Sequence, residues 1–486
     1  MAEQTSHSPN LSGDERESPP RKRPRTKAPP RAAAAAVHST DTVDSAHQPI
    51  PSQPPSDMPE LPQAQPTQAQ PPQVLSSETR RFSIQPLNRF QGASARIKRP
   101  CEVAHFSYDD KHEYRDDDSS INYYVPPPIG ADLKEGFDKF RHYEDKEDPH
   151  LDSLLRAVMH KESSNDRSNA EIKADFVTWR GMMTKIMTAP YDNFAEFSMF
   201  ATLHKGTIYL EEDFPSRAAS RAAESSRPPP RNPHPDQQPQ AMMTYWGYKF
   251  ETLSLIPTPP SSTSPAQIAA HQASTTSNHA QHCSIVSTSF GPHTLLLGGE
   301  VDGLLGPKPP STDTSTPVPW VELKTAEQLP PPHRQQHRDI LRFERKLLKF
   351  WAQSFLLGVP TIVVGFRTKS GVLTGLQSFK THELPGMVRR GTGCWDGNVC
   401  INFAAEFLGW LKGCVREEGR VYSVVLRKKS GVVEVREVGE GTGGIVSEEF
   451  VRWREEKGKD VGSDSNGEKP EDKTEEVKQA SEQPSA

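Results

Sequence analysis

Four charged side chains with the spacing of a catalytic site lie close together in the sequence, within residues 298–325. Glu300 and Asp302 are two residues apart, and so are Glu322 and Lys324. Because side chains alternate along a strand, each pair shares one face. Two neighbouring strands would present three carboxylates and one amine together. Carboxylates of this kind bind Mg²⁺ or Mn²⁺, and an acid followed by Glu-x-Lys is typical of metal-dependent phosphodiesterases.

The alternative is that these residues form solvated cross-strand ion pairs, the usual role of Glu and Lys on exposed strands. The flanking residues argue against it. Three leucines at 295–297 lead into the first pair, and Trp320, Val321 and Leu323 surround the second. Acids held among apolar side chains need a compensating partner. We therefore interpret the cluster as a metal-dependent catalytic site.

The segments that must position this site show helical and strand periodicities. Residues 151–158 and 172–186 each have an apolar stripe at helical spacing, and residues 336–357 form the clearest helix, with one basic face. Residues 243–255 alternate and predict a strand that carries a further acid, Glu251. Other predicted elements are a hairpin at 194–202 and 207–210, strands at 282–290, 361–366 and 372–379, a helix at 399–411, a hairpin at 422–426 and 432–438, and a helix at 446–453.

Composition predicts that much of the chain is disordered. Of 486 residues, 46 are proline and only 33% are hydrophobic, which is low for a globular protein of this length. We expect disorder in a leading region at 1–79, in inserts at 215–240, 257–281 and 304–319, and in an acidic tail at 455–486. The remainder, within 80–454, predicts one large α+β domain in which mixed β-sheets are flanked by helices.

Charge and cysteine content narrow the class of protein. The net charge of −5 disfavours a protein that coats duplex nucleic acid. The basic cluster at 21–27 predicts nuclear import, with a generic basic tail as the alternative. No apolar run is long enough to span a bilayer, so we expect a soluble protein without a membrane partner. The five cysteines lack C-x-x-C spacing, which favours a reducing compartment over a disulfide or zinc framework.

Five motifs occur in one order between Phe82 and Phe450. They are Thr178-Trp179-Arg180-Gly181, Gly247-Tyr248-Lys249-Phe250-Glu251, Gly299-Glu300-Val301-Asp302, Val321-Glu322-Leu323-Lys324-Thr325, and the segment from Lys346 to Phe355. In this pattern the chain resembles the DXO family of RNA 5′-end decapping and pyrophosphohydrolase enzymes, especially its fungal nuclear branch. The resemblance implies a mixed-sheet core with a metal-dependent nuclease site.

The resemblance also implies roles for individual residues. Metal would be bound by Glu251, Asp302, Glu322 and the carbonyl of Leu323, and the reacting phosphate would face Glu300, Lys324 and Gln353. Substrate would be held by Trp179, Arg180 and Gly181, and by Cys283 through its backbone. The chain departs from animal relatives at Lys111-His112 and at Pro149, which leaves its outer cap contacts open.

The implied activity is hydrolysis at RNA 5′ ends with Mg²⁺ or Mn²⁺. One site would release pyrophosphate from triphosphorylated RNA, remove incompletely methylated guanosine caps and remove NAD caps, always leaving a 5′ monophosphate. The resemblance further implies that the protein binds and stimulates the nuclear 5′→3′ exoribonuclease. Two alternatives remain at this point: a non-catalytic adaptor of that exoribonuclease, and a DNA-directed nuclease with the same metal-dependent core.

Overall fold

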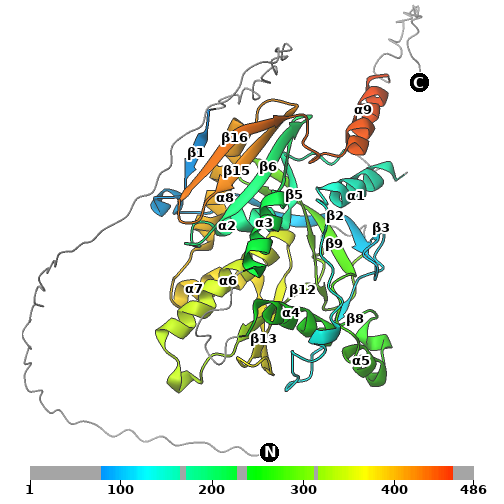
Figure 1. Ribbon diagram of the computed structural model, residues 1–486, viewed down its shortest axis with the longest axis vertical. Helices are drawn as coiled ribbons and strands as arrows, with labels where there is room; N and C mark the ends of the chain where they lie inside the picture. The colour runs from blue at the N-terminus through cyan, green and yellow to red at the C-terminus, as the bar shows by residue number, and fades with distance from the viewer. Residues whose placement is uncertain (1–77, 165–170, 227–237, 311–315, 464–486) are drawn as a thin grey trace, which may run out of the picture. The chain divides into compact units, whose positions relative to one another are not determined.

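The computed structural model describes residues 78–164, 171–226, 238–310 and 316–463. The basic cluster at 21–27 and the disorder expected for 1–77 and 464–486 fall outside these residues. Within them, no helix is both long enough and apolar enough to cross a membrane. Two mixed β-sheets and the helices around them make up the described part of the chain (Figure 1).

The larger sheet has ten strands in the order β1-β16-β15-β6-β7-β5-β10-β9-β2-β3. They are β1 (Arg80–Ser83), β2 (Ile97–Tyr108), β3 (Tyr114–Arg115), β5 (Phe176–Trp179), β6 (Phe197–His204), β7 (Thr207–Glu212), β9 (Gln281–Phe290), β10 (His293–Glu300), β15 (Arg420–Leu426) and β16 (Val432–Glu440). The central strand β5 is parallel to both β7 and β10. In β10, Leu295, Leu296 and Leu297 are all buried, as expected for a strand covered on both faces.

The smaller sheet has six strands in the order β14-β13-β12-β11-β4-β8. They are β4 (Tyr123–Tyr124), β8 (Leu255–Ile256), β11 (Gly303–Leu304), β12 (Trp320–Glu327), β13 (Thr361–Arg367) and β14 (Leu373–Lys380). Strands β12 and β13 are parallel, so a crossover must join them. That crossover contains helix α6 (His337–Leu357).

Helix α6 contacts both sheets, β9 and β10 of the larger one and β12 and β13 of the smaller one. Its apolar stripe explains this position, because Leu347, Phe350 and Trp351 are buried while the basic face stays outside. Helix α2 (Arg180–Thr188) packs beside it (Figure 1). The other helices are α1 (Asp152–Ser163), α3 (Phe214–Ser225), α4 (Gln240–Ser254), α5 (Pro265–Gln272), α7 (Leu384–Arg390), α8 (Gly397–Cys414) and α9 (Glu448–Ser463).

Several sequence predictions are confirmed. Helices α1, α6 and α8 lie where helical periodicity placed them. The predicted hairpins are β6–β7 and β15–β16, both antiparallel. The fold class, mixed sheets flanked by helices in one large domain, is also confirmed.

Two secondary-structure predictions are wrong. Residues 172–186 do not form one helix, because Phe176–Trp179 is the central strand β5 and the helix begins only at Arg180. Residues 243–255 are not a strand but most of helix α4. In that segment the buried residues Tyr245, Lys249 and Leu253 repeat every four positions. A repeat of about four residues is typical of a helix. The aromatic residues of the same segment alternate with polar ones, which is the pattern of a strand and is the reason for the wrong prediction.

The expected disordered inserts also need correction where the structure describes them. In 257–281, Ser264 and Gln267 form a capping box that starts α5, so a segment read as low complexity contains a capped helix. In 215–240, helix α3 begins at Phe214, after the capping residue Asp213, and runs to Ser225. Residues 304–310 and 316–319 have defined positions, and 455–463 of the expected tail continue α9.

Candidate active site

The first pair of predicted acids lies where the chain leaves the larger sheet. Glu300 is the last residue of β10 and is paired in register with Cys283 of β9. Strand β11 of the smaller sheet begins only three residues later, at Gly303. Glu300 and Asp302 therefore do not share a strand that neighbours the Glu322 strand, as the sequence had suggested. Glu300 belongs to one sheet, and Asp302 lies in the crossing to the other.

A glycine makes this crossing possible. A side chain at Gly299 would place its Cβ 2.9 Å from Leu357 Cδ1 and 3.0 Å from Arg180 Cβ. A Cβ this close would require the Leu357 and Arg180 side chains to shift, so a glycine lets the end of β10 approach α2 and α6 without displacing them. The first turn of α2 and the last turn of α6 therefore meet beside Glu300.

Asp302 ties the two sheets together. Its Oδ2 accepts a hydrogen bond of 2.6 Å from the backbone N–H of Leu323, in the middle of β12. Burial raises the pKa of Asp302 to about 7, with Glu322 adding to the effect. The Leu323 backbone thus lies against the Asp302 carboxylate.

Glu322 is the most enclosed acid of the cluster, with no exposed surface. Its Oε1 is 2.6 Å from Lys324 Nζ, and its Oε2 is 3.2 Å from Arg180 Nη1. Burial opposes ionisation, but Lys324 and Arg180 outweigh it and hold the pKa of Glu322 below its ordinary value. Glu322 is therefore an ionised carboxylate held by two cations.

Glu251 comes from helix α4, which packs against β12 (Figure 1). Burial raises its pKa well above the usual range, and Asp302 and Glu300 raise it further. The pKa of Glu300 is also raised, by burial first and by Glu322. Through these mutual effects, Glu251, Glu300, Asp302 and Glu322 form one interacting set, although they come from three elements and the crossing at Asp302.

The charges in this set do not balance. Four carboxylates face two cations, Lys324 and Arg180, and the pKa of each cation is raised in spite of burial because the acids surround it. Fully ionised, the set carries an excess of two negative charges. One divalent cation would neutralise this excess, and oxygen ligands suit Mg²⁺ and Mn²⁺.

The other predicted substrate residues border this set. Trp179 and Gly181 flank Arg180 at the start of α2, where backbone N–H groups attract anions. Gln353 is one turn before Leu357 on α6, so it lies on the side of the helix that reaches Gly299. Burial raises the pKa of the Cys283 thiol. The thiol therefore stays protonated, and binding of substrate by the Cys283 backbone stays a prediction.

A second group of potential ligands was missed from the sequence. Among the described residues, Asp148, His150 and Glu211 bring ligand atoms within 4.8 Å of one another. His150 Nδ1 lies 3.0 and 3.1 Å from the two carboxylate oxygens of buried Glu211. The His150 carbonyl accepts a hydrogen bond from Trp179 Nε1. His150 is the one basic member of this triad beside two acids, and it supports the start of α2 through the Trp179 indole.

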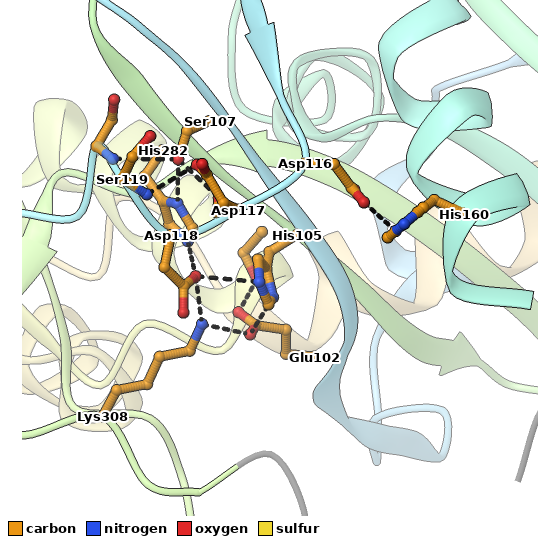
Figure 2. Close-up of polar contacts among 12 residues, drawn as sticks. Glu102, His105, Ser107, Asp116, Asp117, Asp118, Ser119, His160, His282 and Lys308 are labelled. Atoms are coloured by element: carbon orange, nitrogen blue, oxygen red, sulfur yellow. Dashed lines mark hydrogen bonds and ion pairs between the residues drawn. The ribbon is translucent and has the colours of Figure 1, made fainter. Parts of the chain in front are cut away.

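A third cluster holds the loop between the two halves of the site (Figure 2). Lys308, from the segment expected to be disordered, places its Nζ 3.0 Å from Glu102 Oε1 and 3.1 Å from Asp118 Oδ1. His105 bridges the same two acids, at 3.4 and 3.1 Å. Lys308 lies between Asp302 and Trp320 in the sequence. Its ion pair with Glu102 therefore attaches the segment around Lys308 to β2 of the larger sheet.

The cluster in Figure 2 is strongly ionic. Burial works against the charge on Glu102, yet His105, Lys308 and Ser284 lower its pKa to about 2. The sequence offered no signal for this cluster, because Lys308 is about 200 positions from its partners and lies among prolines. It borders a cavity of about 730 Å³ whose lining contains none of the four acids.

The fold and the site together define a class: two mixed sheets that deliver carboxylates and a Glu-x-Lys strand are the framework of a metal-dependent nuclease. Residues 98–451 match the family described as RAI1 like PD-(D/E)XK nuclease. This match spans well over half of the chain. The chain belongs to that family.

Similar proteins agree with this assignment. The chain is 44% identical over 375 residues to "Decapping nuclease RAI1" of Emericella nidulans, covering 77% of this chain and 98% of that protein. It is 32% identical over 344 residues to "Decapping and exoribonuclease protein" of Xenopus laevis, covering 68% and 79%. The crystal structure of Candida albicans Rai1 in complex with pU5-Mn²⁺ is similar with a TM-score of 0.69 at 26% identity, covering 78% of this chain and 99% of that one.

Proposed function

We infer that this protein is a divalent-metal-dependent hydrolase of RNA 5′ ends. The observation that carries the inference is the buried set of four carboxylates beside Lys324 and Arg180 in a chain of the RAI1 family. Burial and mutual repulsion favour the protonated forms of Glu251 and Asp302, and a divalent cation bound by the set would favour their ionised forms instead.

The donor set fits a divalent cation. We assign metal binding to Glu251, Asp302, Glu322 and the carbonyl of Leu323, because burial and then the neighbouring acids raise the pKa values of Glu251 and Asp302, and a bound cation would offset both effects. Relatives support this choice, since one Rai1 structure contains Mn²⁺ with pU5 and another contains calcium with (3′-NADP)⁺. When bound, the cation supplies activation of the attacking water and neutralisation of phosphate charge.

The chain's own residues then bind and orient the RNA end. Arg180 and the N–H groups at the start of α2 attract the phosphates. Lys324 Nζ lies 2.6 Å from Glu322 Oε1, and an ammonium beside the metal-binding acids can neutralise the charge that grows on the scissile phosphate. We assign Glu300, whose pKa is raised by burial and by Glu322, to accept the proton of the attacking water. Gln353 orients the phosphate.

One site of this kind serves several substrates because the step is the same, an in-line attack of water on a phosphorus atom. In triphosphorylated RNA the attack breaks the phosphoanhydride at the first phosphate and releases pyrophosphate. In RNA with an incompletely methylated cap or NAD it breaks a phosphodiester and releases the intact cap or NAD, and in every case the RNA keeps a 5′ monophosphate. The names of relatives support both decapping and nuclease activity.

The partner and the location are further proposals. We propose that the protein passes its 5′-monophosphate product to the nuclear 5′→3′ exoribonuclease, which it binds and stimulates, and that the basic cluster at 21–27 directs it to the nucleus. The support is the resemblance to the fungal nuclear branch and the compact basic sequence. Deleting residues 21–27 should move the protein to the cytoplasm, and an unchanged nuclear signal would count against this role.

The activity is tested with 5′-triphosphate RNA, with and without Mn²⁺. Pyrophosphate release and a 5′-monophosphate product should require the metal and should disappear in Glu322→Gln. A wild-type protein that releases no pyrophosphate, yet stimulates the exoribonuclease on RNA already bearing a monophosphate, would be an adaptor. Hydrolysis of DNA in preference to RNA would instead favour a DNA-directed nuclease.

A further inference from the structure

Phe194 is unusually exposed for an aromatic residue. With 63% of its surface accessible, it is the most exposed of the large hydrophobic residues in the described part of the chain. It lies in the loop between α2 and β6. The loop is not loose there, because the Phe194 N–H donates to Asp192 Oδ1 at 3.0 Å. The ring is therefore held out into solvent by its own backbone.

Two lysines stand over this ring. The turn between β15 and β16 places Lys428 Nζ 5.6 Å and Lys429 Nζ 5.8 Å from the ring centroid. Both side chains are exposed, and no ion pair of either is found among the described residues. Lys429 adopts a positive φ of 64°, which non-glycine residues adopt uncommonly. The turn thus presents two uncompensated ammonium groups beside an aromatic face.

A third lysine connects this place to the active site. Lys349 Nζ is 3.3 Å from Asp192 Oδ2, on the same carboxylate that holds the Phe194 loop. Lys349 precedes Gln353 by one turn of α6 and Leu357 by two turns, and Leu357 reaches Gly299 beside Glu300. Along the helix axis, Lys349 and Leu357 are about 12 Å apart. Helix α6 therefore leads from the neighbourhood of Gly299 and Glu300 to Asp192, the residue that also accepts the Phe194 N–H.

We propose that Phe194, Lys349, Lys428 and Lys429 form a docking patch for the single-stranded RNA that follows the scissile phosphate. The proposal rests on the proposed function, since it needs an RNA end in the active site. Proteins that bind single strands without sequence preference combine cations for the backbone with aromatic rings on which bases stack. The patch has both, at a distance of a few nucleotides from the site.

Charge favours RNA over a protein at this patch. Asp192 is already engaged by Lys349 and the loop, and Glu196 is the one other nearby acid in the loop. The ring is flanked by exposed polar residues, Asn193 and Glu196, and by the two lysines. A protein interface would be expected to surround its aromatic anchor with further apolar surface. A lone ring among cations suits a base and its phosphates.

The test compares two 5′-triphosphate RNAs, a dinucleotide and an oligonucleotide of about a dozen nucleotides, which is within the range of single-strand site sizes. Phe194→Ala should raise KM for the longer RNA by roughly tenfold, because stacking contributes about 1–3 kcal/mol per base. The dinucleotide, too short to reach the patch, should be hydrolysed with the wild-type kcat/KM. Val438→Ala, a residue 45% exposed at the far end of β16, is the matched control.

The lysines are tested by salt dependence. In the double variant Lys428→Gln/Lys429→Gln, the plot of log affinity for the longer RNA against log salt concentration should have a shallower slope, by about 1.4. Each of the two lost phosphate contacts reduces the steepness of this slope by about 0.7. Lys139→Gln, at an exposed lysine of a short helix (Phe137–Lys139) beside α4, should leave the slope unchanged.

Three outcomes would overturn the proposal, and each differs from failure of the proposed function. If Phe194→Ala lowers kcat/KM equally for both RNAs, Phe194 supports the fold or the catalytic site. No change with either RNA would remove the patch from the RNA path. Unchanged RNA kinetics with lost stimulation of the exoribonuclease would make the patch a protein-docking surface. If the wild-type protein hydrolyses neither RNA, the proposed function itself is wrong.

Discussion

Asp302→Asn is expected to stabilise the metal-free protein while abolishing its activity. The pKa of Asp302 is about 7 in the folded chain, because of burial and Glu322, against about 3.9 in an unfolded chain. A folded pKa above the unfolded one means that the folded state holds the proton more tightly. The free energy of unfolding therefore falls as the pH rises from about 4 to about 7, and it stays reduced above that pH.

The size of the effect follows from this difference. About three pKa units correspond to a ceiling of about 4 kcal/mol at pH 8. Partial exposure of Asp302 to water reduces it, so we expect Asp302→Asn to gain roughly 1–2 kcal/mol, or a few degrees in Tm. The asparagine retains an oxygen that can accept the Leu323 N–H. The gain should vanish below about pH 3, where the wild-type carboxyl is protonated in both states.

The assay is thermal unfolding at pH 8 in EDTA and in Mn²⁺. In EDTA the variant should melt above the wild type. In Mn²⁺ the wild type should gain stability that the variant lacks, since ligand binding to the folded state raises Tm. Glu211→Gln is the matched control, because it neutralises the buried acid of the other potential metal group.

Two results would refute this reasoning. If Asp302→Asn melts below the wild type in EDTA at pH 8, repulsion within the four-acid set is not a significant cost. If Mn²⁺ raises both melting temperatures equally, Asp302 is not a ligand. Loss of the Mn²⁺ response in Glu211→Gln alone would move the metal to the Asp148 triad.

Three further predictions concern single side chains. Lys324→Ala should lower kcat for triphosphate RNA by on the order of 10²–10³-fold with little change in KM; a large rise in KM at normal kcat would assign Lys324 to binding alone. Arg180→Gln should weaken RNA binding and raise the pKa of Glu322, measured by the pH dependence of Mn²⁺ affinity, whereas a pH profile identical to the wild type would contradict the ion pair. For Glu102 the lowered pKa of about 2 stabilises the fold above about pH 4.3, and this stability is lost as the pH falls towards 2. In Glu102→Gln, the free energy of unfolding measured with urea should therefore fall less steeply as the pH falls from about 4.3 to about 2. The same pH dependence as in the wild type would show that the Lys308 cluster does not stabilise the segment around Lys308.

Much of this site could be predicted from the sequence because its residues are close in the chain. Glu300 and Asp302 come from one segment, and Glu322 and Lys324 from the next, so alternation along strands was enough to propose a shared site. Glu251 was identified as an acid of the site, although its element was predicted to be a strand. The motif Gly247-Tyr248-Lys249-Phe250-Glu251 was enough to predict the acid. Its secondary structure could not be predicted in the same way, because it depends on which side chains of this segment the rest of the fold buries.

Other features depended on contacts between distant segments. The Lys308 cluster joins residues that are about 200 positions apart, and no local pattern marks such a partnership. The strand at Phe176–Trp179 was read as helix because its apolar residues happen to fall at helical spacing, while β7 and β10, which fix it as a strand, come later in the chain. Helix α5 was hidden in a segment whose proline, serine and threonine content resembled a linker, although Ser264 supplies its cap.

The hydrogen bond from the Leu323 N–H to Asp302 joins one sheet to the other through a proposed metal ligand. A cation bound by Asp302, Glu322 and Glu251 would therefore connect the crossing at the end of β10, strand β12 and helix α4. A movement of one sheet relative to the other would separate these three acids and weaken metal binding, while the apolar core of each sheet stayed intact. Hydrogen exchange at the Leu323 amide should for that reason slow on addition of Mn²⁺, while the amides deep in β10 exchange as before.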